Sequence, residues 1–190
     1  MSNLELLRKI ETILGLFQYA RLKHRERKAL HVTEVARALV SPRSHGRREG
    51  AKIGREAHSK IWALDPFIVL QEEYVSIPFP LAYEIDVGKK KYIIYGVPDL
   101  IKFVRSTPVE VYEFKTYLEK DKYSILQTQI YAWLTWKCFD SYPKAYLILG
   151  WNGRSCKKKI KVEWNLKEIE EEIKRAVMKI LRESVSNVNK

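Results

Sequence analysis

The sequence has 190 residues, of which 46% are hydrophobic and 31% are charged. A chain of this length and composition can bury a core without disulfides, so we expect one folded domain and exclude a disordered chain. Its 35 basic and 23 acidic side chains give a formal net charge of +12. This excess favours a polyanionic partner, nucleic acid before an anionic membrane surface, although lysine-rich surfaces are also common in thermophilic proteins.

Two features of the sequence are typical of a protein of the reducing cytoplasm. Cys138 and Cys156 are the only cysteines and lack C-x-x-C spacing, so we expect both to be small buried side chains. The first residues, MSNLELLRKIETILGLF, contain too many charges for a signal peptide or a membrane span. We therefore predict a soluble cytoplasmic protein that has no membrane partner.

The first third of the chain is predicted to be helical. Apolar residues recur at helical spacing and predict an amphipathic helix over residues 3 to about 28. The stripe expected to face the core is Leu4, Leu7, Ile10, Leu14 and Phe17. Thr33 is expected to cap a short helix that ends near Val40.

A basic segment follows this second helix. Pro42 is expected to end the helix, and a further helix that carries His58 is expected before Pro66. The arginines expected to contact DNA from this segment are Arg43, Arg47 and Arg48. The alternative for these arginines is a solvated helix surface without a binding role.

After Pro66 the pattern changes to short runs of β-branched and aromatic residues. Strands are expected within residues 67–77, 83–87, 92–96, 109–115, 145–151 and 159–164, and helices at 124–139 and 166–184. Gly88 is expected to turn a hairpin between the second and third strands. The predicted class is α/β, with a mixed central sheet flanked by helices over residues 66–190 and a helical portion over residues 1–65, in one domain.

Charged residues stand at the ends of two of these runs. Asp99 closes the run YIIYGVPD, while Glu113 and Lys115 lie two residues apart in VEVYEFK and so share one face of a strand. If the two strands pair, the Asp99 carboxylate reaches the same place. Two convergent carboxylates repel each other unless a cation lies between them, and a lysine beside that cation can orient a water or stabilise charge on a phosphate oxygen.

A purely structural interpretation of these residues stays open. Glu-x-Lys spacing also occurs at Glu26 and at Glu172, where helices are expected, so the spacing alone has little specificity. Glu113 and Lys115 can form an ordinary ion pair, and Asp99 can be a turn residue.

The next helix and the basic segment contribute further candidates. Gln127 and Tyr131 are four residues apart on one helix face and can touch a phosphate or a base edge. His58 can add a third ligand to a site with two carboxylates. In the alternative interpretation, Gln127 and Tyr131 lie at the boundary between core and surface without a binding role, and His58 is a structural helix residue.

In order and spacing together, these motifs resemble the RecB-like branch of the PD-(D/E)XK nuclease superfamily. The matching motifs are Gly54-Arg-Glu-Ala-His58, Pro98-Asp99, Glu113-Phe114-Lys115 and Gln127-Thr-Gln-Ile-Tyr131. The resemblance extends over roughly residues 33 to 150, is greatest to CRISPR-associated and viral RecB-type exonucleases, and implies a restriction-endonuclease-like core.

The resemblance also implies roles for single residues. The ligands that it implies for Mg²⁺ or Mn²⁺ are His58, Asp99, Glu113 and, through its carbonyl, Phe114. Lys115 would serve the attacking water. The residues that it implies as positioning DNA are Gln127 and Tyr131.

One departure from the resemblance concerns iron. Many close members hold a [4Fe–4S] cluster through four cysteines, one of them just before a Pro-Arg pair, but here Ser41 precedes Pro42 and Arg43. We therefore predict no iron–sulfur cluster. The leading hypothesis is a metal-dependent nuclease of single-stranded or end-bearing DNA. The alternatives are a non-catalytic DNA-binding module of a repair or CRISPR complex, and a junction or restriction-type endonuclease.

Overall fold

The structure is a computed structural model that describes residues 3–41 and 65–188, with side chains as far as Glu183. His58 and the helix expected to carry it lie outside the described residues, as do the arginines Arg43, Arg47 and Arg48. The roles expected for these four residues stay predictions.

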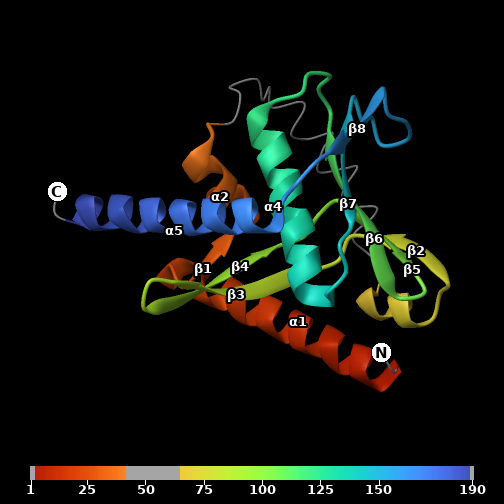
Figure 1. Cartoon of the computed structure of the whole chain (residues 1–190), viewed down its shortest axis with the longest axis horizontal. Coiled ribbons are helices and arrows are strands. Elements are labelled where there is room, and N and C mark those ends of the chain that lie inside the picture. Colours follow the sequence, from red (N-terminus) through yellow and green to blue (C-terminus); the bar gives the residue numbers. More distant parts are fainter. Residues whose placement is uncertain (1–2, 42–64, 189–190) are drawn as a thin grey trace.

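The described residues form two mixed sheets flanked by helices (Figure 1). The helices are α1 (Asn3–Lys23), α2 (Val32–Leu39), α4 (Lys122–Phe139) and α5 (Leu166–Val188), with the 3-10 helices η1 (His24–Glu26) and η2 (Pro66–Leu70). The strands are β1 (Ala29–His31), β2 (Tyr74–Ile77), β3 (Leu81–Val87), β4 (Lys90–Gly96), β5 (Leu100–Val104), β6 (Thr107–Lys115), β7 (Lys144–Leu149) and β8 (Lys158–Val162). The predicted α/β class is confirmed, with two sheets in place of one.

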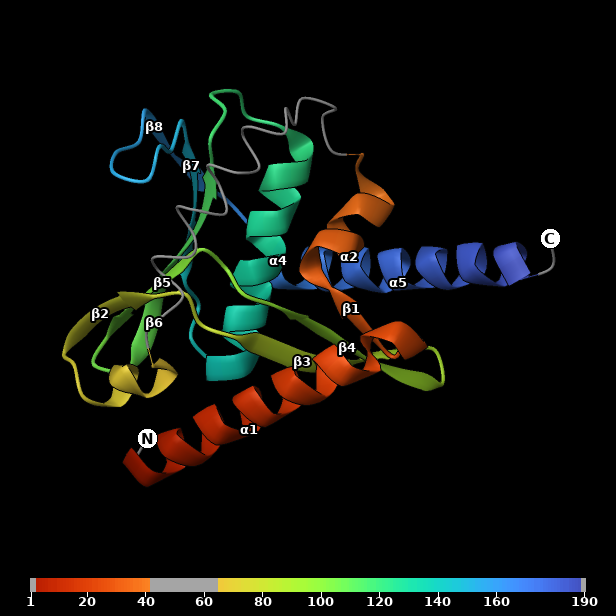
Figure 2. The same cartoon turned by 180° about the vertical axis from the view of Figure 1, so that it is seen from behind.

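The larger sheet has the strand order β2-β5-β6-β7-β8. β6 and β7 run parallel, with α4 as the crossover between them, and the other neighbours are antiparallel. The smaller sheet has the order β1-β4-β3, and Gly88, at a positive φ of 63°, turns the β3–β4 hairpin as predicted. Figure 2 shows α4 between the two sheets and α1 running along β3 and β4.

The core lies around α4. Trp133, Ile130 and Leu134 on this helix have no exposed surface. A helix that is apolar on all sides is typical of a protein interior, which explains why α4 fills the space between the sheets. Among the described residues no helix is long and apolar enough to cross a membrane.

α1 differs from its prediction in length and in its buried face. It ends at Lys23 because η1 follows and Arg27 adopts a positive φ of 57°, which no continuous α-helix contains. Leu4 is 57% exposed, although it was expected in the buried stripe. The buried residues are Leu6, Ile10, Ile13 and Ala20, since the sheet beneath selects this face.

Three local predictions are corrected by hydrogen bonds or exposure. α2 is capped by His31, whose ring accepts the Thr33 N–H at 3.2 Å, so Thr33 is not the cap. Residues 66–70 form η2 instead of a strand, because Asp65 caps them through the Phe67 N–H at 2.9 Å. Cys138 is buried in α4, but Cys156 is exposed in the polar β7–β8 loop.

Candidate active site

Asp99 and Glu113 meet at one end of the β5–β6 hairpin. The register pairs Leu100 with Tyr112, so the next residues outward, Asp99 and Glu113, are neighbours across the antiparallel pair. The Phe114 N–H donates to Asp99 Oδ2 at 2.6 Å, which holds this carboxylate against β6. The hairpin therefore brings the two carboxylates together.

The prediction that Asp99 lies at the end of the strand now called β4, and reaches β6 from there, is wrong. β4 ends at Gly96 and pairs with β1 and β3 in the smaller sheet, so it never reaches β6. Asp99 instead precedes β5, the strand that pairs with β6. The run LIKFV is only five residues long and directly follows a Pro-Asp turn signal, and for this reason it was not recognised as a strand.

Both carboxylates are buried. Asp99 is 6% exposed and Glu113 is 4% exposed. They lie where β6 and its parallel neighbour β7 both end, beside the first turns of α4. Buried carboxylates are stable only when hydrogen-bond donors or positive charges face them. The two carboxylates therefore need a positive charge nearby, and Lys115 is the candidate.

Lys115 connects β6 to α4. Its Nζ lies 2.8 Å from Glu113 Oε1 and 2.8 Å from Gln127 Oε1. Burial disfavours the charged amine, but the charges of Glu113 and Asp99 outweigh burial and raise the pKa of Lys115 above its usual value. The ammonium group therefore stays protonated at neutral pH, where it donates hydrogen bonds and cannot accept a proton.

Gln127 and Tyr131 join the same cluster from α4. They are 5% and 2% exposed, and Gln127 contacts both Lys115 and the Tyr131 hydroxyl. Burial first, and then the charges of Glu113 and Asp99, raise the pKa of Tyr131 well above its usual value. Gln127 thus supports Lys115, and Tyr131 supports Gln127. The role expected for both side chains in positioning DNA stays a prediction.

Two residues of the cluster were missed from the sequence. A Cβ at Gly96 would lie 2.9 Å from Tyr131 Cε1 and 3.1 Å from its hydroxyl, so glycine allows Tyr131 to pack on the end of β4. Tyr123, one turn before Gln127, is 9% exposed, and its hydroxyl is approached by Arg37 of α2. The i, i+4 spacing from Tyr123 to Gln127 is the signal that could have revealed it.

The ligand types fit a hard divalent cation. Asp99 and Glu113 offer carboxylate oxygens, and Mg²⁺ is commonly bound through one or two carboxylates together with waters and phosphate oxygens. Within the described residues, no group of three or more His, Cys, Asp or Glu side chains is placed to hold a metal ion. His58, the expected third ligand, lies outside that range.

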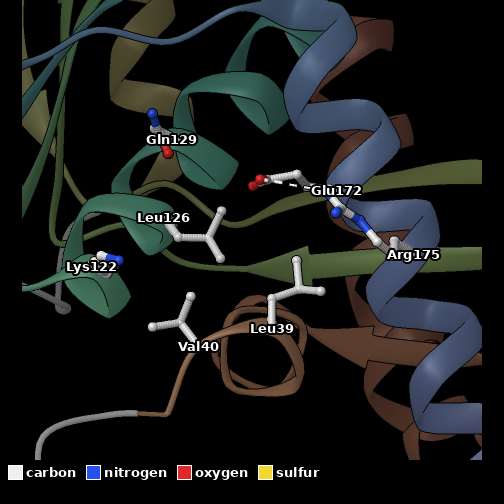
Figure 3. A pocket seen from close by; sticks show the side chains of 7 residues that line it. All are labelled: Leu39, Val40, Lys122, Leu126, Gln129, Glu172 and Arg175. Carbon is white, nitrogen blue, oxygen red and sulfur yellow. Dashed lines mark ion pairs between the residues drawn. The ribbon is translucent and has the colours of Figure 1, made fainter.

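A separate cavity of about 310 Å³ lies between α2, α4 and α5 (Figure 3). Leu126 contributes to its apolar floor, and Glu172 and Arg175 form an ion pair of 3.6 Å at its rim. The remaining lining residues are Leu39, Val40, Lys122 and Gln129. The cavity lies on a different face of α4 from Gln127 and Tyr131 and takes no part in the carboxylate cluster.

Comparison with known proteins supports the fold alone. A crystal structure of SSO0001 matches with a TM-score of 0.50 and 19% sequence identity, over 86% of this chain and 84% of that chain. No family model and no curated protein matches the sequence. At this identity the likeness is one of architecture, and it carries no information about chemistry.

Proposed function

We propose that this protein is a divalent-metal-dependent nuclease that hydrolyses phosphodiester bonds of single-stranded or end-bearing DNA. The observation that supports this most is the meeting of Asp99, Glu113 and Lys115 at one sheet edge. The order of the sequence motifs, which resembles RecB-like nucleases, and the net charge of +12 support it further.

Lys115 would act as a charge stabiliser in this reaction. Glu113 and Gln127 accept two hydrogen bonds of 2.8 Å from its ammonium group, and these bonds restrain the otherwise flexible lysine side chain. With these two hydrogen bonds in place, Lys115 would donate to a water or to a phosphate oxygen and so stabilise the charge that develops there.

Asp99 and Glu113 would hold the metal ion, with the Phe114 carbonyl and His58 as the further ligands implied by the resemblance. A bound Mg²⁺ or Mn²⁺ supplies Lewis acidity at the phosphate and lowers the pKa of a water. In the hydrolysis, a water oxygen bonds to phosphorus and gives up a proton to solvent, one phosphorus–oxygen bond to a sugar breaks, and the leaving oxygen takes up a proton.

The first test removes each carboxylate charge without changing side-chain size. Asp99→Asn and Glu113→Gln are expected to lower cleavage of a labelled single strand at least a hundredfold, since each would remove a charged metal ligand. The digest is run with Mg²⁺, with Mn²⁺ and with EDTA, on single-stranded and duplex substrates. DNA binding, measured separately by anisotropy, is expected to persist.

Glu110→Gln is the matched control, because Glu110 lies on β6 but on the face opposite to Glu113. It is expected to cleave like the parent. Parental turnover in Asp99→Asn or Glu113→Gln would contradict the assigned site. Binding without any cleavage by the parent in either metal would favour a non-catalytic DNA-binding module.

A further inference from the structure

The loop between β6 and α4, residues 116–121, exposes an aromatic ring beside the proposed site. Tyr117 is 39% exposed and Leu118 is 50% exposed. Single exposed apolar residues are common on protein surfaces and need no explanation. Tyr117 differs from such residues because its ring is held in place.

The Tyr117 hydroxyl is anchored at the buried start of α4. It donates to Asp121 Oδ2 at 2.7 Å and lies within hydrogen-bond distance of Ser124 Oγ. Asp121 is 8% exposed and caps α4 through the Ser124 N–H at 2.9 Å. Burial above all, and the hydrogen bond to Asp121, raise the pKa of Tyr117 to about 12, so the phenol stays neutral. One end of the ring is therefore fixed while part of it faces solvent.

The loop backbone is tied to the β7–β8 loop. The Gly150 N–H donates to the Tyr117 carbonyl at 2.9 Å, and the Trp151 N–H donates to the Lys115 carbonyl at 2.9 Å. A Cβ at Gly150 would lie 2.6 Å from Leu118 Cδ2, so the two loops are closely packed. Figure 1 shows both loops at the same end of the molecule. Tyr117 thus stands on a fixed support two residues beyond Lys115.

Exposed lysines lie in the same part of the chain and on the neighbouring loop. Lys120 and Lys122 follow Tyr117 in sequence, and Lys157 packs next to Gly150. Aromatic rings interleaved with basic side chains are the combination that binds unpaired nucleic acid, because rings stack on bases and cations contact phosphates.

On the basis of the proposed nuclease function, we infer that Tyr117 stacks on one unpaired base of the bound strand, beside the phosphate that lies at the proposed metal site. A base inside an intact duplex has both faces covered by its neighbours, so this contact selects single strands and frayed ends. Tyr117 is thus a substrate-positioning residue with a preference for unpaired DNA.

The test compares two labelled oligomers of equal length and charge, one of thymidines and one of abasic residues. Binding is measured by fluorescence anisotropy in EDTA, so that no cleavage takes place. The parent is expected to prefer the thymidine oligomer. Tyr117→Ala is expected to weaken binding of that oligomer about tenfold and to leave binding of the abasic oligomer unchanged. Tyr117→Phe keeps the ring but removes the hydroxyl that anchors it to Asp121, so it is expected to bind the thymidine oligomer more tightly than Tyr117→Ala and less tightly than the parent.

Tyr19→Ala is the control, because Tyr19 on α1 is 48% exposed and lies on another element. If Tyr117→Ala does not fold, Tyr117→Leu replaces it, since leucine keeps bulk without an aromatic face. Equal losses for both oligomers, or no loss for either, would overturn the stacking contact while leaving the nuclease proposal intact. Failure of the parent both to bind DNA in EDTA and to cleave it with Mg²⁺ or Mn²⁺ would instead overturn the proposed function.

Discussion

At the scale of single residues, Lys115 balances the charge of the site. Its Nζ lies 2.8 Å from Glu113, whose side chain is almost fully buried. Lys115→Met removes this cation from a buried carboxylate and is expected to lower the free energy of unfolding by about 3 kcal/mol. Urea unfolding at pH 7 in EDTA measures the change, without any contribution from bound metal.

Lys91→Met is the matched control. Lys91 also forms an ion pair, at 2.7 Å from Glu84, but both side chains are largely exposed. Its loss is expected to cost at most about 1 kcal/mol. Equal effects in the two variants would mean that the buried pair does not stabilise the fold.

The sequence predicted which side chains of the site share a face better than it predicted how the strands and helices bring them together. The two-residue period of a strand places Glu113 and Lys115 on one face whatever the rest of the fold, and helix spacing does the same for Gln127 and Tyr131. The burial of Tyr131 could not be predicted in this way. It depends on the end of β4, where Gly96 lies in a different sheet.

At the scale of elements, the cap of α2 is expected to depend on pH. The His31 ring accepts the Thr33 N–H only when its nitrogen is unprotonated, and burial above all lowers the pKa of His31 below 6.5. The cap therefore stabilises the fold fully above pH 6.5 and is lost as the pH falls through the lower folded-state pKa. The expected loss is about 1 kcal/mol.

His31→Asn separates this effect from other titrations, since asparagine also caps helices but carries no titrating group. The difference between parent and variant in free energy of unfolding is measured at pH 7 and at pH 5. The parent is expected to lose more stability over this interval. An identical loss in the variant would assign the pH dependence to other groups.

A second prediction at this scale concerns two glycines. Gly96→Ala is expected to destabilise the fold by about 1 to 3 kcal/mol, because its Cβ would meet the buried Tyr131 ring at 2.9 Å. Gly15→Ala in α1 meets nothing within 4 Å and is expected to stabilise by about 1 kcal/mol. Thermal unfolding of both variants checks the opposite signs, and a neutral Gly96→Ala would contradict the close packing of Tyr131 on β4.

Element types were more predictable than element ends. The long apolar run of α4 and the β-branched run of β6 are each recognisable alone. The end of α1 depends on a positive φ at Arg27, and the cap of α2 depends on a histidine, a residue that is not among the usual caps. Neither feature leaves a strong local signal.

At the scale of the whole molecule, the division into two sheets was not predicted. Strand pairing between distant segments leaves no pattern in a single sequence, so a pairing of β4 with β6 was considered, although β4 pairs with β1 and β3. The consequence is a helix, α4, that is enclosed by both sheets and carries Gln127 and Tyr131 inward. The contact of Gln127 with Lys115 therefore depends on both sheets, because together they hold α4 in place.

The distribution of charge over the molecule gives the last prediction. Lys120 and Lys122 are exposed at the site end of α4, whereas Lys89 and Lys90 are exposed on the β3–β4 hairpin, away from that end in both views (Figures 1 and 2). If the bound strand runs past the site, replacing both Lys120 and Lys122 with Ala lowers the slope of log affinity against log salt by about 1.4, roughly 0.7 for each phosphate contact. Replacing Lys89 and Lys90 leaves the slope unchanged. Equal slopes in the two double variants would place the strand elsewhere.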